Sequence, residues 1–280
     1  MREMTDEETK KIQKYELEIL AEFDRVARKN NLKYMLVGGT LLGAIRHKGF
    51  IPWDDDIDIG MPRKDFEVFK KIWKKEVNTK KFFYQDMDNT ENYGMIFGKL
   101  KMKDTLLVEK TNNINKEDQA FWIDIFPFDK INSNYKKAKR DLLKGYILKL
   151  VYYLKCKNKL IEHTFIRKCA AFILKFMSLF YSKERCKYKL NKLYHKYDSN
   201  KEYKIVSYGG TYIFKEICDI NYFDNLIEGE FENRIFLIPK EYDKYLTDIY
   251  GDYMKLPPVE KRKSHHEIIE IKFPKKDSKN

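Results

Sequence analysis

The segment Asp54–Ile59, with the sequence DDDIDI, constrains the fold of this chain more than any other stretch. Asp56 and Asp58 alternate with isoleucines, and in a β-strand this places both carboxylates on one face and the isoleucines on the other. Neighbouring carboxylates repel, so each is costly to ionise without a nearby positive charge. A divalent cation is the usual partner, and Mg²⁺ prefers one or two carboxylates together with substrate phosphates. The alternative is a solvated acidic loop, which the interleaved isoleucines disfavour.

A further carboxylate, Asp124, lies inside the apolar run Phe121–Pro127. A buried carboxylate without a partner is expensive, so the pattern predicts that Asp124 meets a metal or a cation. The alternative is an edge strand on which Asp124 faces solvent. Two carboxylates on one strand and a third on its neighbour form the pattern of two-metal phosphoryl-transfer enzymes.

The tripeptide Gly38-Gly39-Thr40 follows an apolar stretch at 33–37 and precedes a predicted short helix. Glycines permit a tight turn and a close approach of the backbone to a ligand. The start of a helix offers N–H groups and a positive dipole end to a phosphate. An ordinary strand–helix turn is the simpler interpretation of these residues alone. The segment matches neither a Walker A loop nor GxGxxG, so neither a P-loop NTPase nor a Rossmann dehydrogenase is supported.

Apolar periodicity predicts the order of elements along the rest of the chain. Helices are expected over about 6–30, from Pro62 to about Lys75, and over 240–250. Short strands are expected at 82–85, 95–100, 106–109 and 120–126, and a hairpin at 228–239. Alternating strands and helices in the first 130 residues favour an α/β or α+β catalytic core.

Charge is concentrated in one segment of this chain of 280 residues, whose formal net charge is +13. Residues 135–195 hold 17 basic and 3 acidic side chains, a net charge of +14, and the remainder has a net charge of −1. This excludes a uniformly basic binding protein. The segment is helical by pattern, so the predicted organisation is a catalytic core at 1–134, a basic helical insertion at 135–200 and a C-terminal part at 201–280 that returns to the core.

Basic amphipathic helices of this composition lie on anionic membrane surfaces. The alternative is a helical subdomain with solvated lysines and an apolar face packed on the core. Nucleic-acid binding is a third interpretation, but no recognised motif supports it.

Three features of the sequence indicate the cellular compartment: the start of the chain, the cysteines and the longest apolar stretch. MREMTDEETKK contains no apolar signal region, and the four cysteines form no CxxC pair. The longest apolar stretch, Cys169–Tyr181, is interrupted by Lys175 and is shorter than the ~20 residues that span a bilayer. We expect a cytoplasmic protein that can lie at the inner face of the cell membrane.

Near its end the chain carries YGDYMKLPP at Tyr250–Pro258, followed by KRKSHH at 261–266. Adjacent histidines in a strand point to opposite faces, so His265 and His266 are a poor chelating pair. A contact with phosphate or a role as a base is the functional interpretation, and a basic tail without function is the alternative.

Together these stretches resemble the LicD family of phosphocholine transferases, which is related to fukutin and the fukutin-related protein. The resemblance rests on GGTLLGAIRHKGFIPWDDDIDIGMPRKDF (Gly38–Phe66), FWIDIFPFD (Phe121–Asp129) and the C-terminal motif. It implies an α+β fold with a nucleotidyltransferase-like mixed sheet and a Mg²⁺ or Mn²⁺ site. It also implies transfer of a phospho-alcohol from a CDP-activated donor to a glycan hydroxyl, with release of CMP.

Bacterial members of the LicD family usually take CDP-choline as the donor, although eukaryotic relatives use CDP-ribitol. The usual acceptors are sugars of teichoic acid or lipopolysaccharide, often built on lipid carriers. Choline has no hydrogen-bond donor on nitrogen, so its site needs aromatic faces for cation–π contact. The aromatic candidates are Trp53, Tyr93, Trp122, Tyr208 and Tyr212.

The resemblance also implies residue roles. Asp56 and Asp58 bind metal with help from Asp54, and Asp124 is the third carboxylate and a candidate general base. The expected donor-binding residues are Gly38, Gly39, Thr40, Arg46, Arg63, Lys99, His265 and His266. Arginines suit phosphate because they bond it in a bidentate way.

Two other function classes remain open at this point. A nucleotidyltransferase that moves NMP to a small acceptor would have similar carboxylates and would release pyrophosphate. A basic scaffold or nucleic-acid-binding protein would not depend on Asp56 at all.

Overall fold

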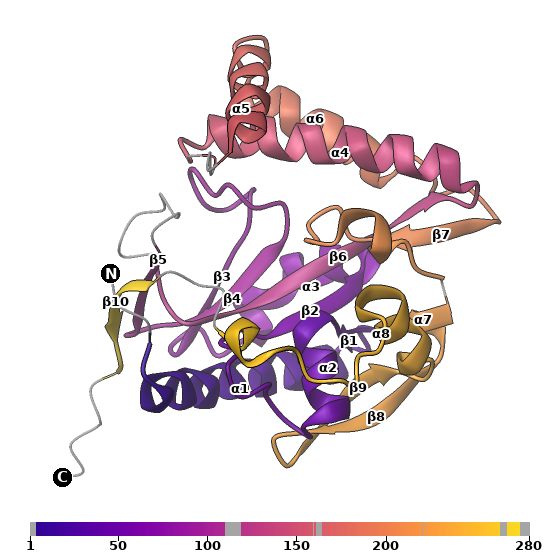
Figure 1. The fold of residues 1–280 in the computed structure, drawn as a ribbon. Helices are drawn as coiled ribbons and strands as arrows, with labels where there is room; N and C mark the ends of the chain where they lie inside the picture. The colour runs from indigo at the N-terminus through magenta and orange to yellow at the C-terminus, as the bar shows by residue number, and fades with distance from the viewer. Residues whose placement is uncertain are drawn as a thin grey trace.

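The computed structural model describes residues 4–109, 119–158, 160, 164–219, 221–263 and 268–274. Within these residues the core is a six-stranded sheet, with the order β1 (Met35–Leu36), β2 (Asp58–Pro62), β6 (Trp122–Asn132), β4 (Gly98–Met102) and β3 (Phe82–Gln85). The sixth strand, β7 (Tyr203–Val206), pairs with the second half of β6. Strands β2 and β6 are parallel, and the other pairs are antiparallel. The mixed sheet with its helices confirms the predicted fold class (Figure 1).

Helices α1 (Asp6–Lys29) and α3 (Arg63–Glu76) pack together against the sheet. Thr5 and Glu8 form a capping box at the start of α1, as the sequence predicts. The rings of Phe23 on α1 and Phe69 on α3 lie 5.2 Å apart in the main apolar core. The short helix α2 (Gly38–Arg46) begins directly at Gly38, so the Gly-Gly-Thr segment is its first turn rather than a preceding loop.

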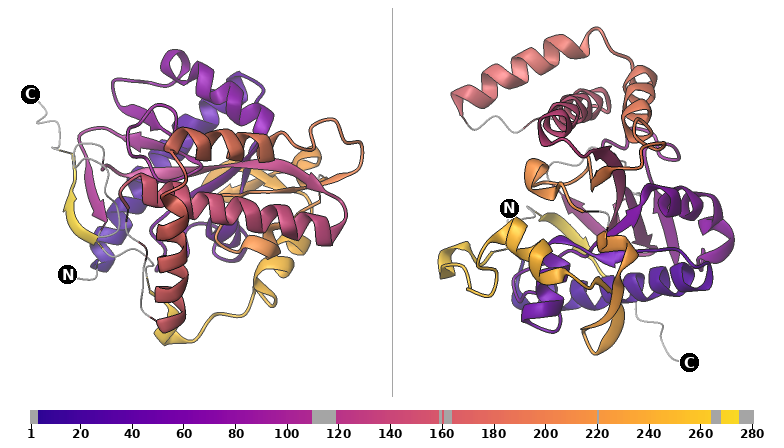
Figure 2. Two further views of the ribbon diagram at one scale, coloured as in Figure 1. Left: turned by 90° about the horizontal axis from the view of Figure 1, so that it is seen from above. Right: turned by 90° about the vertical axis from the view of Figure 1, so that its right-hand side faces the viewer.

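Helices α4 (Tyr135–Lys155), α5 (Phe165–Ser178) and α6 (Lys183–Tyr194) form a layer on the other side of the sheet (Figures 1 and 2). This confirms the helical prediction for the basic segment. The layer has its own apolar cluster, which includes Leu142, Val151 and Leu190 and is separate from the main core. No helix in the described ranges combines the length and apolarity needed to cross a membrane.

The C-terminal part adds a hairpin, short helices and a second small sheet. The hairpin of β8 (Leu226–Phe231) and β9 (Arg234–Pro239) turns at Glu232 and Asn233, both with positive φ. The further elements are η2 (Ile213–Glu216), α7 (Asn221–Asp224), α8 (Tyr242–Tyr250), η3 (Val259–Lys261) and the antiparallel pair β5 (Leu106–Glu109) and β10 (Ile268–Lys272).

Sequence periodicity misses β7 and β10, because these strands are short and are fixed by pairing with distant segments. It also places the end of β6 six residues too early, because the strand continues through Pro127 to pair with β7.

Candidate functional site

Three charged side chains form one row across neighbouring strands of the main sheet. Asp58 on β2 lies opposite Asp124 on β6, and Asp124 lies opposite Lys99 on β4. The Lys99 Nζ donates to Asp124 Oδ1 at 2.6 Å, and both residues are less than a tenth exposed. The strand register therefore places Asp124 beside Asp58, and it places the ammonium group of Lys99 beside Asp124. The sequence predicts such a neighbouring carboxylate and such a cation.

The aspartate segment alternates between core and cavity, as its sequence indicates. Ile57 and Ile59 are fully buried, whereas Asp56 and Asp58 line two cavities. Burial, followed by the charges of Asp56 and Asp124, raises the pKa of Asp58 well above its ordinary value, and Lys99 opposes this effect. Ionising all of these carboxylates together is therefore costly, and a cation bound in the cavity would lower that cost.

The first turn of α2 fits closely against these carboxylates. Gly38 has a φ of +55°, and a Cβ built on it would lie 3.1 Å from Asp58 Oδ2. A Cβ on Gly39 would lie 2.7 Å from Asp54 Oδ2, so a larger residue there would displace this carboxylate, whereas the positive φ of Gly38 itself favours glycine. The Thr40 hydroxyl accepts a hydrogen bond of 2.8 Å from the Asp58 backbone N–H, which fixes the start of β2.

The carboxylates lie where two cavities meet, at Asp56, Asp58, Phe126 and Thr211. We call the smaller one, of about 420 Å³, the acidic lobe, and its lining includes Gly38, Gly39, Trp53, Asp54, Tyr212, Glu216 and Tyr250. We call the larger one, of about 710 Å³, the basic lobe, and its lining includes Lys99, Asp124, Tyr146, Lys149 and Arg167.

The acidic lobe combines aromatic faces with carboxylates. The rings of Tyr212 and Tyr250 lie 5.5 Å apart and nearly perpendicular. Glu216 accepts from the Tyr212 backbone N–H at 3.3 Å, and burial raises the pKa of Glu216 to about 7. Within the described part of the chain, no Lys, Arg or His side chain lines this lobe. Its walls therefore favour a ligand group that is positively charged or apolar.

The basic lobe lies between the sheet and the helical layer. Lys149 on α4 donates to the carbonyls of Gly209 and Gly210 at 3.2 and 3.4 Å, and burial lowers the pKa of this lysine. Arg167 reaches the lobe from α5, and Lys99 reaches it from the sheet. These three cations suit a ligand that carries phosphate.

Two predicted arginines do not join the carboxylates. Arg63 is bound to Asp129 at 2.6 and 2.8 Å, with its guanidinium 4.1 Å from the centre of the Tyr194 ring. Arg46 donates to the Tyr253 carbonyl at 2.7 Å, and neither arginine lines either lobe. The predicted residues His265 and His266 lie outside the described residues.

Three charged residues near the site were not predicted from the sequence: Glu16, Lys149 and Glu216. Glu16, on α1, is fully buried, and neither of its carboxylate oxygens has a hydrogen-bond partner within the described residues. Burial, followed by the nearby charges of Asp55 and Asp56, raises the pKa of Glu16 well above its ordinary value. Glu16 lies on the same helix face as the buried residues Ile12 and Leu20, so the helical periodicity of the sequence already indicated that Glu16 is buried.

The aromatic candidates for choline separate in the structure. Trp53 and Tyr212 line the acidic lobe, whereas Tyr93, Trp122 and Tyr208 are buried and line neither lobe. Arg262 lies over the Trp53 ring, 5.6 Å from its centre.

A metal ion bound by the protein alone requires several donor side chains that converge on one point. Among the described residues, no group of three or more His, Cys, Asp or Glu side chains converges as a metal site. The pair Asp56 and Asp58 nevertheless offers hard oxygen atoms in a cavity, which suits a Mg²⁺ ion that takes its other ligands from substrate phosphates.

Comparisons with known proteins match the part of the chain that carries this row of residues. The family model described as "LicD/FKTN/FKRP, nucleotidyltransferase domain" matches residues 31–146, which include the whole row of charged side chains. Over 34 residues the chain is 53% identical to the human Ribitol 5-phosphate transferase FKRP. This alignment covers 12% of this chain and 7% of that protein. It is 31% identical over 263 residues to the Lipopolysaccharide cholinephosphotransferase LicD of Haemophilus influenzae. That alignment covers 89% of this chain and 92% of the relative, and the chain therefore belongs to the LicD family.

Proposed function

We propose that this protein transfers phosphocholine from CDP-choline to a hydroxyl group of a cell-surface glycan such as lipopolysaccharide or teichoic acid, and releases CMP. The observation that carries the proposal is the pairing of an aromatic, acidic lobe with a cationic lobe on either side of Asp56 and Asp58. The cholinephosphotransferase named above supports the same activity.

The acidic lobe selects the alcohol in this proposal. A quaternary ammonium group gains cation–π contact with Tyr212 and Tyr250 and attraction to Glu216. A neutral polyol such as ribitol would gain neither the cation–π contact nor the attraction to Glu216. The lobe therefore favours choline over an uncharged alcohol.

The acceptor hydroxyl attacks the phosphorus that bears choline, and the bond from that phosphorus to the bridging oxygen breaks. CMP leaves with the electron pair of this bond, and the hydroxyl proton passes to the Asp124 carboxylate. Lys99, 2.6 Å from Asp124 Oδ1, favours the ionised form that can accept this proton. Positioning and charge stabilisation supply most of the rate in such transfers.

Asp56 and Asp58 would hold a Mg²⁺ or Mn²⁺ ion, with Asp54 and Asp124 beside them. When bound, the ion screens the negative charge of the phosphate oxygens. Gly38 and Gly39, at the start of α2, line the acidic lobe, and their N–H groups would contact the donor phosphates where the two lobes meet.

The test is incubation of the purified protein with Mg²⁺, a glycan acceptor and either CDP-choline, CDP-ethanolamine or CDP-ribitol, with all nucleotide products identified. We expect acceptor-dependent release of CMP, fastest with CDP-choline and abolished by EDTA. Release of pyrophosphate from a nucleoside triphosphate, with no CMP from CDP-choline, would instead identify a nucleotidyltransferase. Equal rates with all three donors would contradict the choline assignment alone.

A further inference from the structure

Helix α5 presents two different faces. Its inner face, with Arg167, Ala170, Ala171 and Leu174, lines the basic lobe. Its outer face leaves Phe172 72% exposed, and Ile173 and Phe176 are each more than half exposed. Contiguous apolar side chains of this size are rare on the free surface of a soluble monomer.

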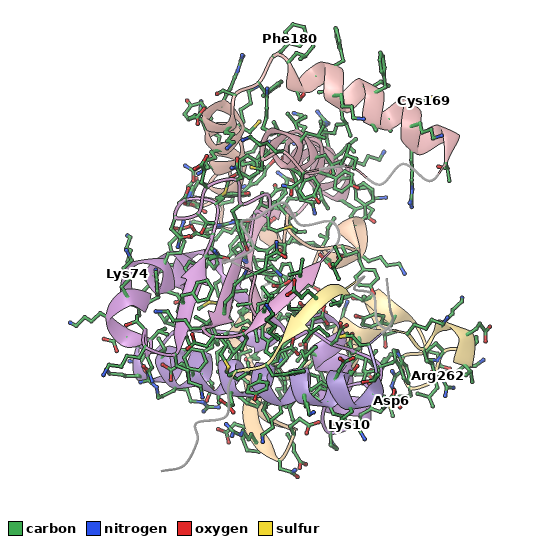
Figure 3. The ribbon with its side chains drawn as sticks, turned by 90° about the vertical axis from the view of Figure 1, so that its left-hand side faces the viewer. Asp6, Lys10, Lys74, Cys169, Phe180 and Arg262 are labelled. Carbon is green, nitrogen blue, oxygen red and sulfur yellow. The ribbon has the colours of Figure 1, made fainter. Side chains whose placement is uncertain are left out.

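The apolar ridge continues past the end of the helix. Leu179 and Phe180 are also more than half exposed, and the ring of Phe180 lies 5.3 Å from that of Phe176. Figure 3 labels Cys169 on this helix and Phe180 just beyond its end, at the outer edge of the molecule. In Figure 2 the helix extends from the body of the molecule as the most distant part of the helical layer. We call this surface, made of Phe172, Ile173, Phe176, Leu179 and Phe180, the α5 ridge.

Positive charge surrounds the α5 ridge. Lys168 and Lys175 belong to the same helix, which contains no acidic residue. Met177 and Tyr181, at the end of the ridge, also line a groove of about 680 Å³ between the helices. The groove is lined by the apolar residues Ile147, Leu148 and Leu193 and by four lysines, Lys144, Lys189, Lys192 and Lys196. Asp141 of the same lining pairs with Lys196 at 2.6 Å, which leaves a net positive charge around the groove.

We propose that the α5 ridge docks on the surface of an anionic lipid bilayer. Its aromatic and aliphatic side chains would enter the boundary between head groups and acyl chains, and the surrounding lysines would face lipid phosphates. A segment with a net charge of +14 favours an anionic lipid surface over an uncharged protein partner.

Docking in this orientation would also suit the lipid-carried acceptors that the family resemblance implies, a consequence that rests on the proposed function. The inner face of α5 lines the basic lobe, so a docked ridge brings that lobe beside the lipid surface. The acceptor that fits this position is a glycan carried on a lipid, presented from the membrane to Asp124 and Lys99.

Co-sedimentation of the full chain with vesicles tests the proposal, without donor or acceptor. Vesicles of phosphatidylcholine alone are compared with vesicles that contain about one-third phosphatidylglycerol, at low and high salt. The variant Phe172→Ser/Phe176→Ser removes two ridge residues. The matched control, Val259→Ser/Ile269→Ser, removes two apolar residues that are as exposed but lie outside the helical layer.

We expect the wild-type protein and the control to bind the anionic vesicles and to be released by salt. The ridge variant should bind about tenfold more weakly. Three results would overturn the proposal: no binding of wild-type protein at low salt, equal losses in both variants, or a wild-type dimer that the ridge variant abolishes without any vesicle binding. The last result would identify the ridge as a contact between two copies of the chain.

A second readout separates this proposal from the catalytic one. Turnover of a short, water-soluble acceptor should be unchanged in the ridge variant, whereas turnover of a lipid-carried acceptor in anionic vesicles should fall about tenfold with the loss of binding. Vesicle binding without any CMP release would contradict the proposed function and leave the docking surface standing.

Discussion

The row Asp58–Asp124–Lys99 and the helical layer of α4–α6 use charged residues in opposite ways. In the row, a lysine and its carboxylate partner are almost fully buried, and strand pairing fixes which side chain lies beside which. In the layer, many lysines lie at the surface, around apolar side chains that are also exposed. The comparison teaches that buried charges placed by backbone register form a site for chemistry, whereas surface charges on an amphipathic helix form a site for attachment.

The largest expected effect is on the row itself. Asp58→Asn removes one carboxylate of the pair proposed to hold the metal, so turnover should fall about 10³-fold while the fold is retained. Steady-state CMP release and circular dichroism measure the two properties. Asp104→Asn is the matched control, because Asp104 is exposed and has a φ of 59°, which asparagine tolerates. If Asp58→Asn and Asp104→Asn lost turnover equally, the row would not be the site of chemistry.

Breaking one half of the buried pair should destabilise the protein. Lys99→Met leaves Asp124 buried without this cation, so the free energy of unfolding should fall by about 3 kcal/mol. The double variant Lys99→Met/Asp124→Asn should recover most of this stability but none of the turnover. Urea unfolding of the two variants checks the expectation. A double variant no more stable than Lys99→Met would show that the pair is not the source of the loss.

Aromatic truncation sharpens the contrast between the two regions. Phe23→Ala removes a fully buried ring from the main core and should cost about 4 kcal/mol. Phe176→Ala removes a ring that is 57% exposed and should cost less than about 0.5 kcal/mol. Thermal unfolding in solution measures both changes. A large loss for Phe176→Ala would mean that the ridge contributes to folding rather than to docking.

The smallest effect concerns the acidic lobe. Burial raises the pKa of Glu216 to about 7, so this carboxyl is mostly protonated below that pH and ionised above it. Only the ionised form attracts choline, so the KM for CDP-choline should fall about threefold as the pH rises through 7. Glu216→Gln should remove this dependence.

Inhibition by CMP provides the control for the same lobe. The inhibition constant of CMP should be equal in the wild-type protein and in Glu216→Gln, because CMP has no choline. A parallel change for CMP would place the cytosine, rather than choline, beside Glu216.

Much of the row could be predicted from the sequence, because its signals are local. The single acid among apolar residues at Asp124 depends on strand geometry, which a few neighbouring residues determine. The alternation in Asp54–Ile59 is also found, although β2 begins only at Asp58, so Asp56 precedes the strand on which the sequence placed it. The arginines could not be placed in this way. Arg63 directly follows β2, the strand that carries Asp58, yet it pairs with Asp129 from β6, a contact that tertiary packing decides.

The two lobes could not be predicted from residues that are neighbours in the sequence. Lys149 reaches the basic lobe from α4, after the chain has left the sheet, and Glu216 reaches the acidic lobe from η2, after the chain has returned to the sheet at β7. Glu16 was within reach, since it shares a helix face with Ile12 and Leu20, but a charged residue on an apolar face contradicts the usual pattern.

The walls of the two lobes come from different parts of the molecule. No residue of α4, α5 or α6 lines the acidic lobe among the described residues, whereas α4 and α5 form one wall of the basic lobe. Only two residues, Ser133 and Asn134, join the sheet to α4. A small rotation of the helical layer about this junction would change the width of the basic lobe directly. It would act on the acidic lobe through Lys149 of α4, which donates to the carbonyls of Gly209 and Gly210, because Gly210 lines that lobe. The two lobes would therefore be mechanically linked at this lysine, so that a change of fit on one side is felt on the other.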